Sequence, residues 1–205
     1  DIVFGVCSRG TDAAWNAEKC ERALSLLAPV SDPQLQKMVV VTSIEDLKWL
    51  IAKRLEGLVW VAYNSERGMT PAAELGDIRA SVTEFARIAH AAGLRAIWAP
   101  TNTMLQADES VLELTRNLDG MAFQHQKVLQ YQGVPAFIEL TKQRAQAARR
   151  YNPAVRTSVQ VVVGRGSEEQ LVDGLRAIKG DVSEIKIFSM RDTGAIGRIL
   201  RAVRN

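Results

Sequence analysis

The feature that most constrains this chain is the alternation of short apolar runs with longer segments of helical periodicity. Apolar runs of about four to eight residues are typical of buried strands, and a period of 3.6 residues is typical of helices packed on a core. We expect strands at Ile2–Ser8, Lys37–Ser43, Gly57–Asn64, Leu94–Asn102, Gly120–Gln126, Ser158–Gly164 and Glu184–Met190. Helices are expected at Ile44–Leu55, Asp77–Ala92, Val134–Arg150, from the cap Ser167 to Lys179, and at Thr193–Arg204. The pattern predicts parallel strands joined by crossover helices.

The two faces of the predicted strands differ in polarity. Alternate positions project to opposite sides of a strand. One set is apolar and is expected to face the helices: Val59, Val61, Ile97, Ala99, Met121, Phe123, Val159, Val161 and Val163. The other set carries amides, at Asn64, Asn102, Gln124, Gln126 and Gln160. A polar interior face favours a (β/α) TIM-barrel-like domain, incomplete or distorted with about seven strands, over an open doubly wound sheet.

Length and composition fit one folded domain spanning residues 1–205. The chain is 47% hydrophobic and 24% charged, which is typical of a soluble globular protein. A net charge of +3 without a basic, aromatic-rich patch predicts no nucleic-acid partner, and apolar runs such as Met38–Thr42 are too short to cross a membrane. His90 and His125 have no partner at metal-ligand spacing, so neither a metal nor a cofactor is expected. The oligomeric state is left open.

The chain starts at Asp1 and has only two cysteines. The start residue is compatible with a removed leader, so we expect an extracellular protein, with a cytoplasmic location as the alternative. Cys7 and Cys20 are expected to be packing thiols, and a bridge between them is the alternative.

Candidate site residues gather where the predicted strands end. In a parallel barrel, the carboxyl ends of the strands aim side chains into a shared pocket. The substrate-binding candidates there are Tyr63, Asn64, Asn102, Gln124, Gln126 and Gln160. Amides donate and accept hydrogen bonds but do not titrate, so this set suits recognition of a hydroxyl-bearing or amide-bearing ligand. Alternatively, these amides satisfy one another and ordered water.

Two charged residues are the catalytic candidates. Glu66 follows Asn64 in a loop and could act as an acid or base, although a solvated loop carboxylate is the alternative. A glycosidase usually needs two carboxylates, and no second one is evident at a strand end. Lys186 is expected on the inward side of the last strand, where a desolvated amine could form a Schiff base. The alternative is an exposed strand lysine paired with Glu184.

Two glycine-bearing turns precede predicted helices. Gly166 and Ser167 belong to the first turn and Gly194 to the second. Free backbone N–H groups at helix N-termini bind phosphate, so these turns are weak phosphate candidates. The alternative explains Ser167 fully as a helix cap.

Several short motifs resemble a group of uncharacterised actinobacterial barrel proteins that are often exported and glycoside-hydrolase-like. The similar motifs are Tyr63-Asn64-Ser65-Glu66, Met69-Thr70-Pro71, His90-Ala91-Ala92-Gly93-Leu94, Ala99-Pro100, Gln124-His125-Gln126 and the turn at residues 148–153. The resemblance implies a barrel with Glu66, Gln124 and Gln126 at its mouth, but no reaction. Lys186 departs from the expected pattern of that group.

Three functions follow as expectations. The first is a carbohydrate-active or carbohydrate-binding barrel whose partner is a small polar molecule or carbohydrate, with Glu66 as acid or base. The second is a lyase or isomerase of a phosphorylated metabolite that uses Lys186. The third is a non-catalytic binding or scaffold domain.

Overall fold

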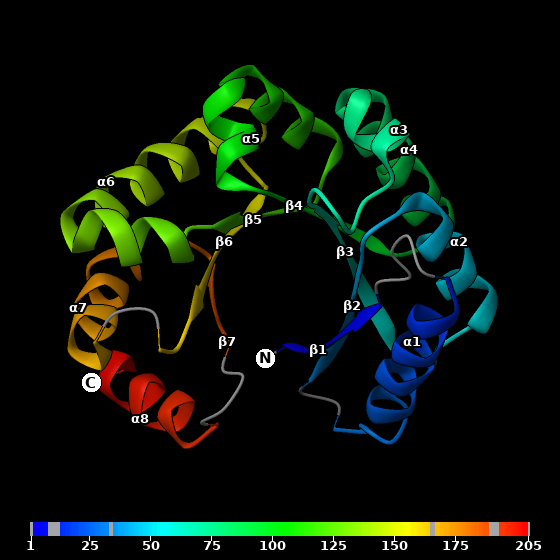
Figure 1. The fold of residues 1–205 in the computed structure, drawn as a ribbon, viewed down its shortest axis with the longest axis horizontal. Coiled ribbons are helices and arrows are strands. Elements are labelled where there is room, and N and C mark those ends of the chain that lie inside the picture. The colour runs from blue at the N-terminus through cyan, green and yellow to red at the C-terminus, as the bar shows by residue number, and fades with distance from the viewer. Residues whose placement is uncertain (1, 8–12, 33–34, 165–166, 189–192, 205) are drawn as a thin grey trace. The chain divides into compact units, whose positions relative to one another are not determined.

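The computed structural model describes residues 2–7, 13–32, 35–164, 167–188 and 193–204. Its strands are β1 (Ile2–Cys7), β2 (Gln36–Val41), β3 (Leu58–Ser65), β4 (Arg95–Pro100), β5 (Gly120–Gln124), β6 (Arg156–Val162) and β7 (Glu184–Phe188). Its helices are α1 (Ala13–Leu27), α2 (Ile44–Lys53), α3 (Ala72–Gly76), α4 (Ile78–Ala91), α5 (Asn102–Ala107), the 3₁₀-helix η1 (Glu109–Asn117), α6 (Gln126–Tyr151), α7 (Glu168–Ile178) and α8 (Thr193–Arg204). A helix follows each strand (Figure 1). This order confirms the predicted α/β fold of the (β/α)-barrel type with seven strands.

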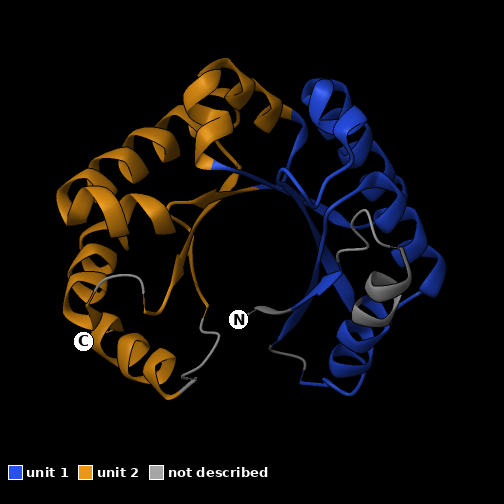
Figure 2. Cartoon of the chain, viewed as in Figure 1, with its two compact units in different colours: residues 1–101, 117–120 blue, residues 102–116, 121–205 orange. Residues whose placement is uncertain are grey.

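The chain divides into two compact units (Figure 2). Unit 1 comprises residues 1–101 and 117–120, and unit 2 comprises residues 102–116 and 121–205. The extent of a single domain over residues 1–205 stays a prediction, and each unit is described by itself.

Unit 1 contains β1 to β4, which pair in parallel in chain order. Val39 and Val61 are register partners with no exposed surface. Tyr63 lies on the same face as Val61, because alternate residues of a strand share a face. Its ring stacks on Phe85 of α4, with ring centroids 5.2 Å apart, so this is the helix-covered face.

The predicted orientation of Ile97 and Ala99 is wrong. The register pairs Ala62 with Ile97 and Asn64 with Ala99, which puts Ile97 and Ala99 on the face opposite to the helices. Trp98, rather than its neighbours, shares the helix-covered face with Tyr63. Residues 96–99 are all buried, so both faces of β4 are apolar and the alternation of polarity could not fix its phase.

The expectation of free packing thiols is also wrong, since Cys7 and Cys20 form a disulfide. Cys7 pairs in register with Val41 and therefore lies on the helix-covered face of β1. Cys20 lies on α1, which packs on that strand, and neither cysteine has exposed surface. Disulfides are typical of oxidising compartments, and the pairing is compatible with export, which stays a prediction.

Unit 2 contains β5, β6 and β7 in sequential order. Val159 and Val161 are fully buried on β6. On the opposite face, Gln160 pairs in register with Lys186 of β7. The predicted division into an apolar face and a polar face therefore holds for β6 and β7.

The connection after β5 differs from the prediction, which placed a loop between Gln126 and Val134. Helix α6 begins at Gln126, directly after His125, instead of at Val134. Gly133 has φ +82°, a conformation that L side chains rarely adopt, and it breaks α6 into two helical segments just before Pro135. Consequently β5 ends at Gln124, and Gln126 is the first residue of a helix instead of the last of a strand.

The predicted helix starts at Ser43 and Ser167 are confirmed. The Asp46 N–H donates to Ser43 Oγ over 3.0 Å at the start of α2. At α7, the Gln170 N–H donates to Ser167 Oγ, and the Ser167 N–H donates back to the Gln170 side chain. This reciprocal pair satisfies two N–H groups that a helix end leaves open. No helix in the described residues is long and apolar enough to cross a membrane.

Candidate functional site

The candidate site residues fall into separate groups. Tyr63, Asn64 and Glu66 belong to unit 1. The remaining described candidates belong to unit 2: Asn102, Gln124, Gln126, Gln160, Ser167, Lys186 and Gly194. Gly166 lies outside the described residues. Each group is therefore considered alone.

The richest polar arrangement lies on the face of β5, β6 and β7 that is opposite to the helices. Gln160 and Lys186 are register partners, so their side chains leave the sheet on the same side as neighbours. Both are half-buried. Gln124 ends β5 and is 8% exposed, and alternation with the fully buried Phe123 turns it away from the helix-covered face. Two amides and one amine thus share a sheet face in unit 2.

The amine of Lys186 is electrostatically unusual. Burial lowers the pKa of Lys186 to about 8, while the Glu184 carboxylate opposes this shift and the Arg156 guanidinium adds to it. Glu184 forms an ion pair with Arg156, so part of its charge is balanced from β6. At pH 7 about a tenth of the Lys186 amine is neutral, and only the neutral form is nucleophilic.

The junction between β5 and α6 contains His125 and Gln126. The His125 Nδ1 atom lies 2.9 Å from Thr141 Oγ1 of α6, and its ring stacks on Phe123, with centroids 5.6 Å apart. His125 thus points toward the helix layer. Burial, reinforced by the charge of Arg144, lowers the pKa of His125 to about 3. The His125 ring is therefore neutral at physiological pH.

Two buried polar atoms at this junction have no hydrogen-bond partner within the described part of the chain. They are His125 Nε2 and Gln126 Oε1. Buried polar atoms without a protein partner usually bind ordered water. We therefore expect water at this junction, and Gln126 stays a predicted ligand-binding residue.

The Asn102 side chain is hydrogen-bonded to a positively charged residue of α6. Its Oδ1 atom accepts a hydrogen bond of 2.6 Å from Nη1 of Arg144 on α6. The Arg144 side chain is almost fully buried, and burial lowers its pKa. Since the Asn102 oxygen is occupied by Arg144, we leave Asn102 out of the polar face.

The acid candidate of unit 1, Glu66, lies in a tight loop. The Glu66 N–H donates to Thr70 Oγ1 over 3.0 Å, and the Thr70 hydroxyl donates to the Asn64 carbonyl. The Asn64 side-chain amide lies 3.5 Å from Glu66 Oε2, at the limit of a weak hydrogen bond. Glu66 is half-buried, so the loop holds its carboxylate beside Asn64 while leaving it partly exposed.

The side chain of Tyr63 is part of the packed interior of unit 1. It is fully buried, and its hydroxyl donates to Glu74 Oε2 over 2.7 Å. Burial and this hydrogen bond raise the pKa of Tyr63 far above its ordinary value. Both Glu74 carboxylate oxygens also accept from the Ile44 N–H at the start of α2. Sequence reasoning missed Glu74, because nothing in the local pattern marks a contact across 30 residues.

The phosphate candidates are explained locally. Ser167 is the reciprocal cap of α7 described above, and Gly194 is the second residue of α8. Apart from its place at the start of a helix, neither residue has a feature that indicates a phosphate site.

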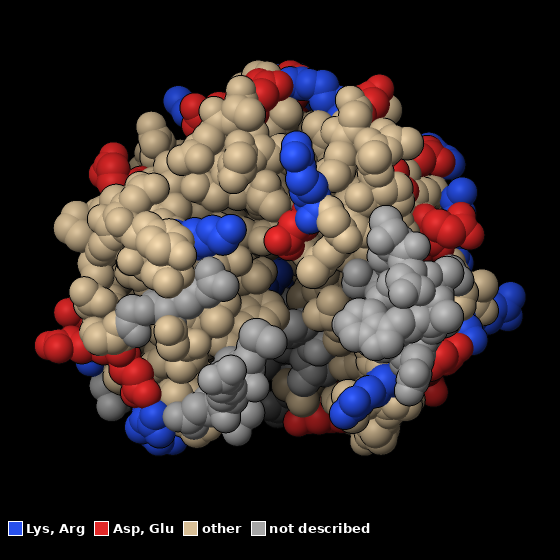
Figure 3. All heavy atoms as spheres, viewed as in Figure 1, with Lys and Arg blue, Asp and Glu red and all other residues tan. Residues whose placement is uncertain are grey.

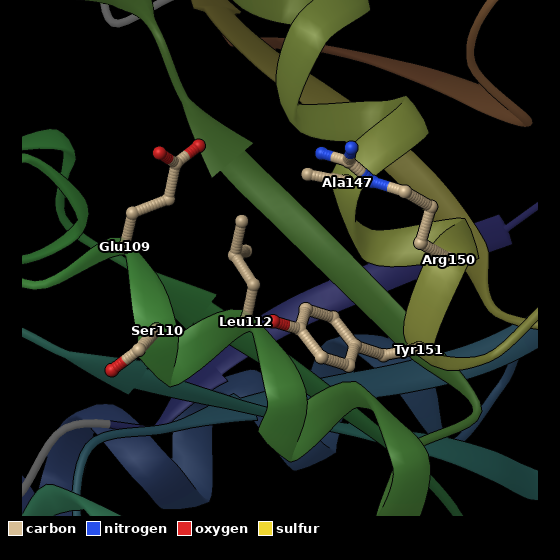
Figure 4. A pocket seen from close by; sticks show the side chains of 6 residues that line it. All are labelled: Glu109, Ser110, Leu112, Ala147, Arg150 and Tyr151. Atoms are coloured by element: carbon tan, nitrogen blue, oxygen red, sulfur yellow. The ribbon is translucent and has the colours of Figure 1, made fainter.

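A groove of about 470 Å³ in unit 2 was not predicted. Its lining residues come from η1 and the end of α6: Glu109, Ser110, Leu112, Ala147, Arg150 and Tyr151 (Figure 4). Tyr151 ends α6 only a few residues before Arg156 begins β6. The groove therefore lies near the amino end of β6, whereas the predicted site lies at the carboxyl ends of the strands. No sequence motif distinguished Glu109.

Charge is dispersed on the face drawn in Figure 3. Lys and Arg side chains there are interspersed with Asp and Glu, in keeping with the nearly equal totals of 26 basic and 23 acidic residues.

No protein-family model matches the chain, and no curated protein matches it either. Among solved structures, it is similar to the catalytic domain of a family GH18 chitinase from the fern Peteris ryukyuensis, with 12% identity and a TM-score of 0.66. That match covers 98% of this chain and 87% of the chitinase chain.

Two further solved structures are similar. A citrate lyase from Burkholderia xenovorans LB400 has 11% identity and a TM-score of 0.62, with 97% of this chain and 67% of the other covered. The N-terminal domain of a putative aldolase from Bacteroides vulgatus has 11% identity and a TM-score of 0.55, with 100% and 74% covered. At these identities the likeness establishes the fold alone.

The fold class is therefore the α/β fold of the (β/α)-barrel type, with seven strands in the described residues. The barrel fold implied by the resemblance to actinobacterial proteins is confirmed. Membership of that particular group stays a hypothesis.

Proposed function

We propose that this protein binds a small hydroxyl-bearing ligand, of the carbohydrate class, on the polar face formed by Gln124, Gln160 and Lys186. The observation that carries the proposal is the register pairing of Gln160 with Lys186. An amide beside an ammonium group offers N–H donors and a carbonyl acceptor, which together match the donor and acceptor character of sugar hydroxyls. The chitinase neighbour supports the carbohydrate class only through the shared fold.

Calorimetric titration with a panel of neutral mono- and oligosaccharides tests this proposal. We expect Gln160→Ala to weaken binding of any sugar ligand by about tenfold, because one or two hydrogen bonds contribute about 1 to 2 kcal/mol. Gln143→Ala is the matched control, since Gln143 is an exposed amide on α6. Equal loss in both variants, or no binding by the wild type across the panel, would contradict the proposal.

The hydrolase form of the proposal adds Glu66 as the acid or base. Its support is the partly exposed carboxylate held beside Asn64. Glu66→Gln keeps the shape of the side chain but cannot exchange a proton, so it should abolish any glycosidase activity. Glu45→Gln, which changes an exposed carboxylate on α2, is the control. Full glycosidase activity in Glu66→Gln would eliminate this role.

The second candidate function is a lyase or isomerase that forms a Schiff base on Lys186. The specific observation favouring it is the pKa of about 8 for a half-buried lysine on an inward strand face. Borohydride reduction with carbonyl substrates, with and without a phosphate group, should then leave a covalent adduct on Lys186. Lys186→Met should lose the adduct, whereas the surface variant Lys127→Met should keep it. An adduct that persists in Lys186→Met would rule out this function.

A further inference from the structure

A cluster of possible metal ligands lies in unit 1. It consists of Cys7 at the end of β1, Cys20 on α1 and Asp46 in the first turn of α2. One ligand atom from each residue lies within 4.8 Å of the others. All three side chains are buried, with Asp46 only 1% exposed.

Two hydrogen bonds hold Asp46 in place, one to its carboxylate and one from its backbone N–H. The Thr42 hydroxyl donates to Asp46 Oδ2 over 3.2 Å, and the Asp46 N–H donates to Ser43 Oγ. The buried Asp46 carboxylate and the two sulfur atoms thus bring one hard and two soft ligand atoms to a single place.

We propose that Cys7, Cys20 and Asp46 form, when the disulfide is reduced, a three-ligand site for a thiophilic divalent cation such as Zn²⁺. Ligand atoms around a tetrahedral Zn²⁺ lie roughly 3.6 to 3.8 Å apart, given its usual bond lengths to sulfur and oxygen. The three ligand atoms lie within 4.8 Å of one another, and reduction of the disulfide frees the two sulfur atoms to separate to that spacing. Two sulfur donors favour Zn²⁺ over Mg²⁺ or Ca²⁺, which prefer oxygen.

Formation of the metal site takes two steps, reduction of the disulfide and then binding of the cation. A phosphine reduces the disulfide with two electrons and becomes a phosphine oxide with an oxygen atom from water, and the two protons of that water go to the two thiols. Binding of the cation then releases both thiol protons, and the two thiolates and the carboxylate take three coordination positions. A water molecule can take the fourth. The same residues therefore hold a covalent bond under oxidising conditions and a metal ion under reducing ones.

Titration of the full chain with Co²⁺, with and without a phosphine reductant, tests this proposal. The reduced protein should bind about one Co²⁺ per chain and develop thiolate-to-Co²⁺ charge-transfer absorption in the near ultraviolet. The oxidised protein should show neither. Absence of this absorption in the reduced wild type would overturn the proposal.

Variants separate a three-ligand site from a pair of thiols. Cys20→Ala should lose the absorption, and Asp46→Asn should keep it but bind Co²⁺ at least about tenfold more weakly. Glu45→Gln, which alters the exposed carboxylate next to Asp46, should bind like the wild type. Unchanged affinity in Asp46→Asn would overturn the proposal. If reduction alone lowers the helical circular dichroism signal, Co²⁺ must restore it, and failure to do so would also count against the site.

Discussion

Gln160 of β6 and Lys186 of β7 are register partners, and both side chains leave the sheet on the face opposite to the buried Val159 and Val161. The pairing puts an amide beside an amine whose pKa burial lowers to about 8. A polar face of this kind costs stability when empty, because the Lys186 ammonium is partly removed from water. Binding of a polar ligand would recover part of that cost.

Stability should therefore rise with pH in a way that depends on Lys186. The folded-state pKa of about 8 lies below the ordinary value of 10.5, so the unfolded chain binds more protons between these values. The free energy of unfolding should gain up to ~3 kcal/mol from this residue between pH 7 and pH 10.5. Urea unfolding of the wild type and of Lys186→Met across this range isolates the effect. If the free energy of unfolding changes with pH in the same way in both proteins, Lys186 does not contribute as predicted.

His125 should not titrate in the physiological range. Its pKa of about 3 means that the folded state keeps the ring neutral, whereas the unfolded chain protonates it below about pH 6.5. The contribution of His125 to stability is thus present above pH 6.5 and is lost as the pH falls toward 3. NMR of the imidazole protons, with His90→Gln used to assign the remaining histidine, should show constant His125 shifts from pH 5 to pH 8. A titration midpoint inside that interval would contradict the described burial.

The hydrogen bond from Tyr63 to Glu74 should contribute measurably to unit 1. Tyr63→Phe removes the donor to a carboxylate while keeping the stacking on Phe85, so we expect a loss of about 1 to 3 kcal/mol in the free energy of unfolding. Tyr131→Phe is the control, because Tyr131 is 73% exposed. Urea denaturation measures the free energy of unfolding of both variants and of the wild type. A loss of similar size at Tyr131 would show that the hydroxyl of Tyr63 has no special role.

The disulfide should stabilise the oxidised chain. It closes a loop between residues separated by 13 positions, for which restriction of the unfolded chain predicts about 3 kcal/mol. The double variant Cys7→Ala, Cys20→Ala should unfold at correspondingly lower urea concentration under non-reducing conditions. A wild type that is equally stable with and without a phosphine, in metal-free buffer, would argue against this contribution.

The sequence was informative where one physical signal acted alone. Periodicity located all seven strands within a few residues, and the caps at Ser43 and Ser167 follow from local chain chemistry. It failed where two faces of a strand were equally apolar, as at Ile97 and Ala99. It also failed at Gln126, where helix formation after β5 replaced the expected strand end.

The candidate site was only partly predictable for a similar reason. The inward placement of Lys186 follows from alternation with Ile185 and Ile187, and β7 keeps that alternation. The contacts of Tyr63 with Glu74 and of Asn102 with Arg144 join residues 11 and 42 positions apart. Such contacts depend on tertiary packing, which no local pattern encodes. The contact with Arg144 is the reason why Asn102 is not assigned to the proposed ligand face in unit 2, which consists of Gln124, Gln160 and Lys186.

The most direct test of that face is an NMR titration that follows the side-chain amides of Gln124 and Gln160 and the Lys186 Nζ group while neutral sugars are added. The proposed function predicts that all three signals shift together with one affinity, while the exposed amide of Gln143 stays unchanged. Sugar-induced shifts confined to other residues, or no shifts at millimolar sugar, would contradict it.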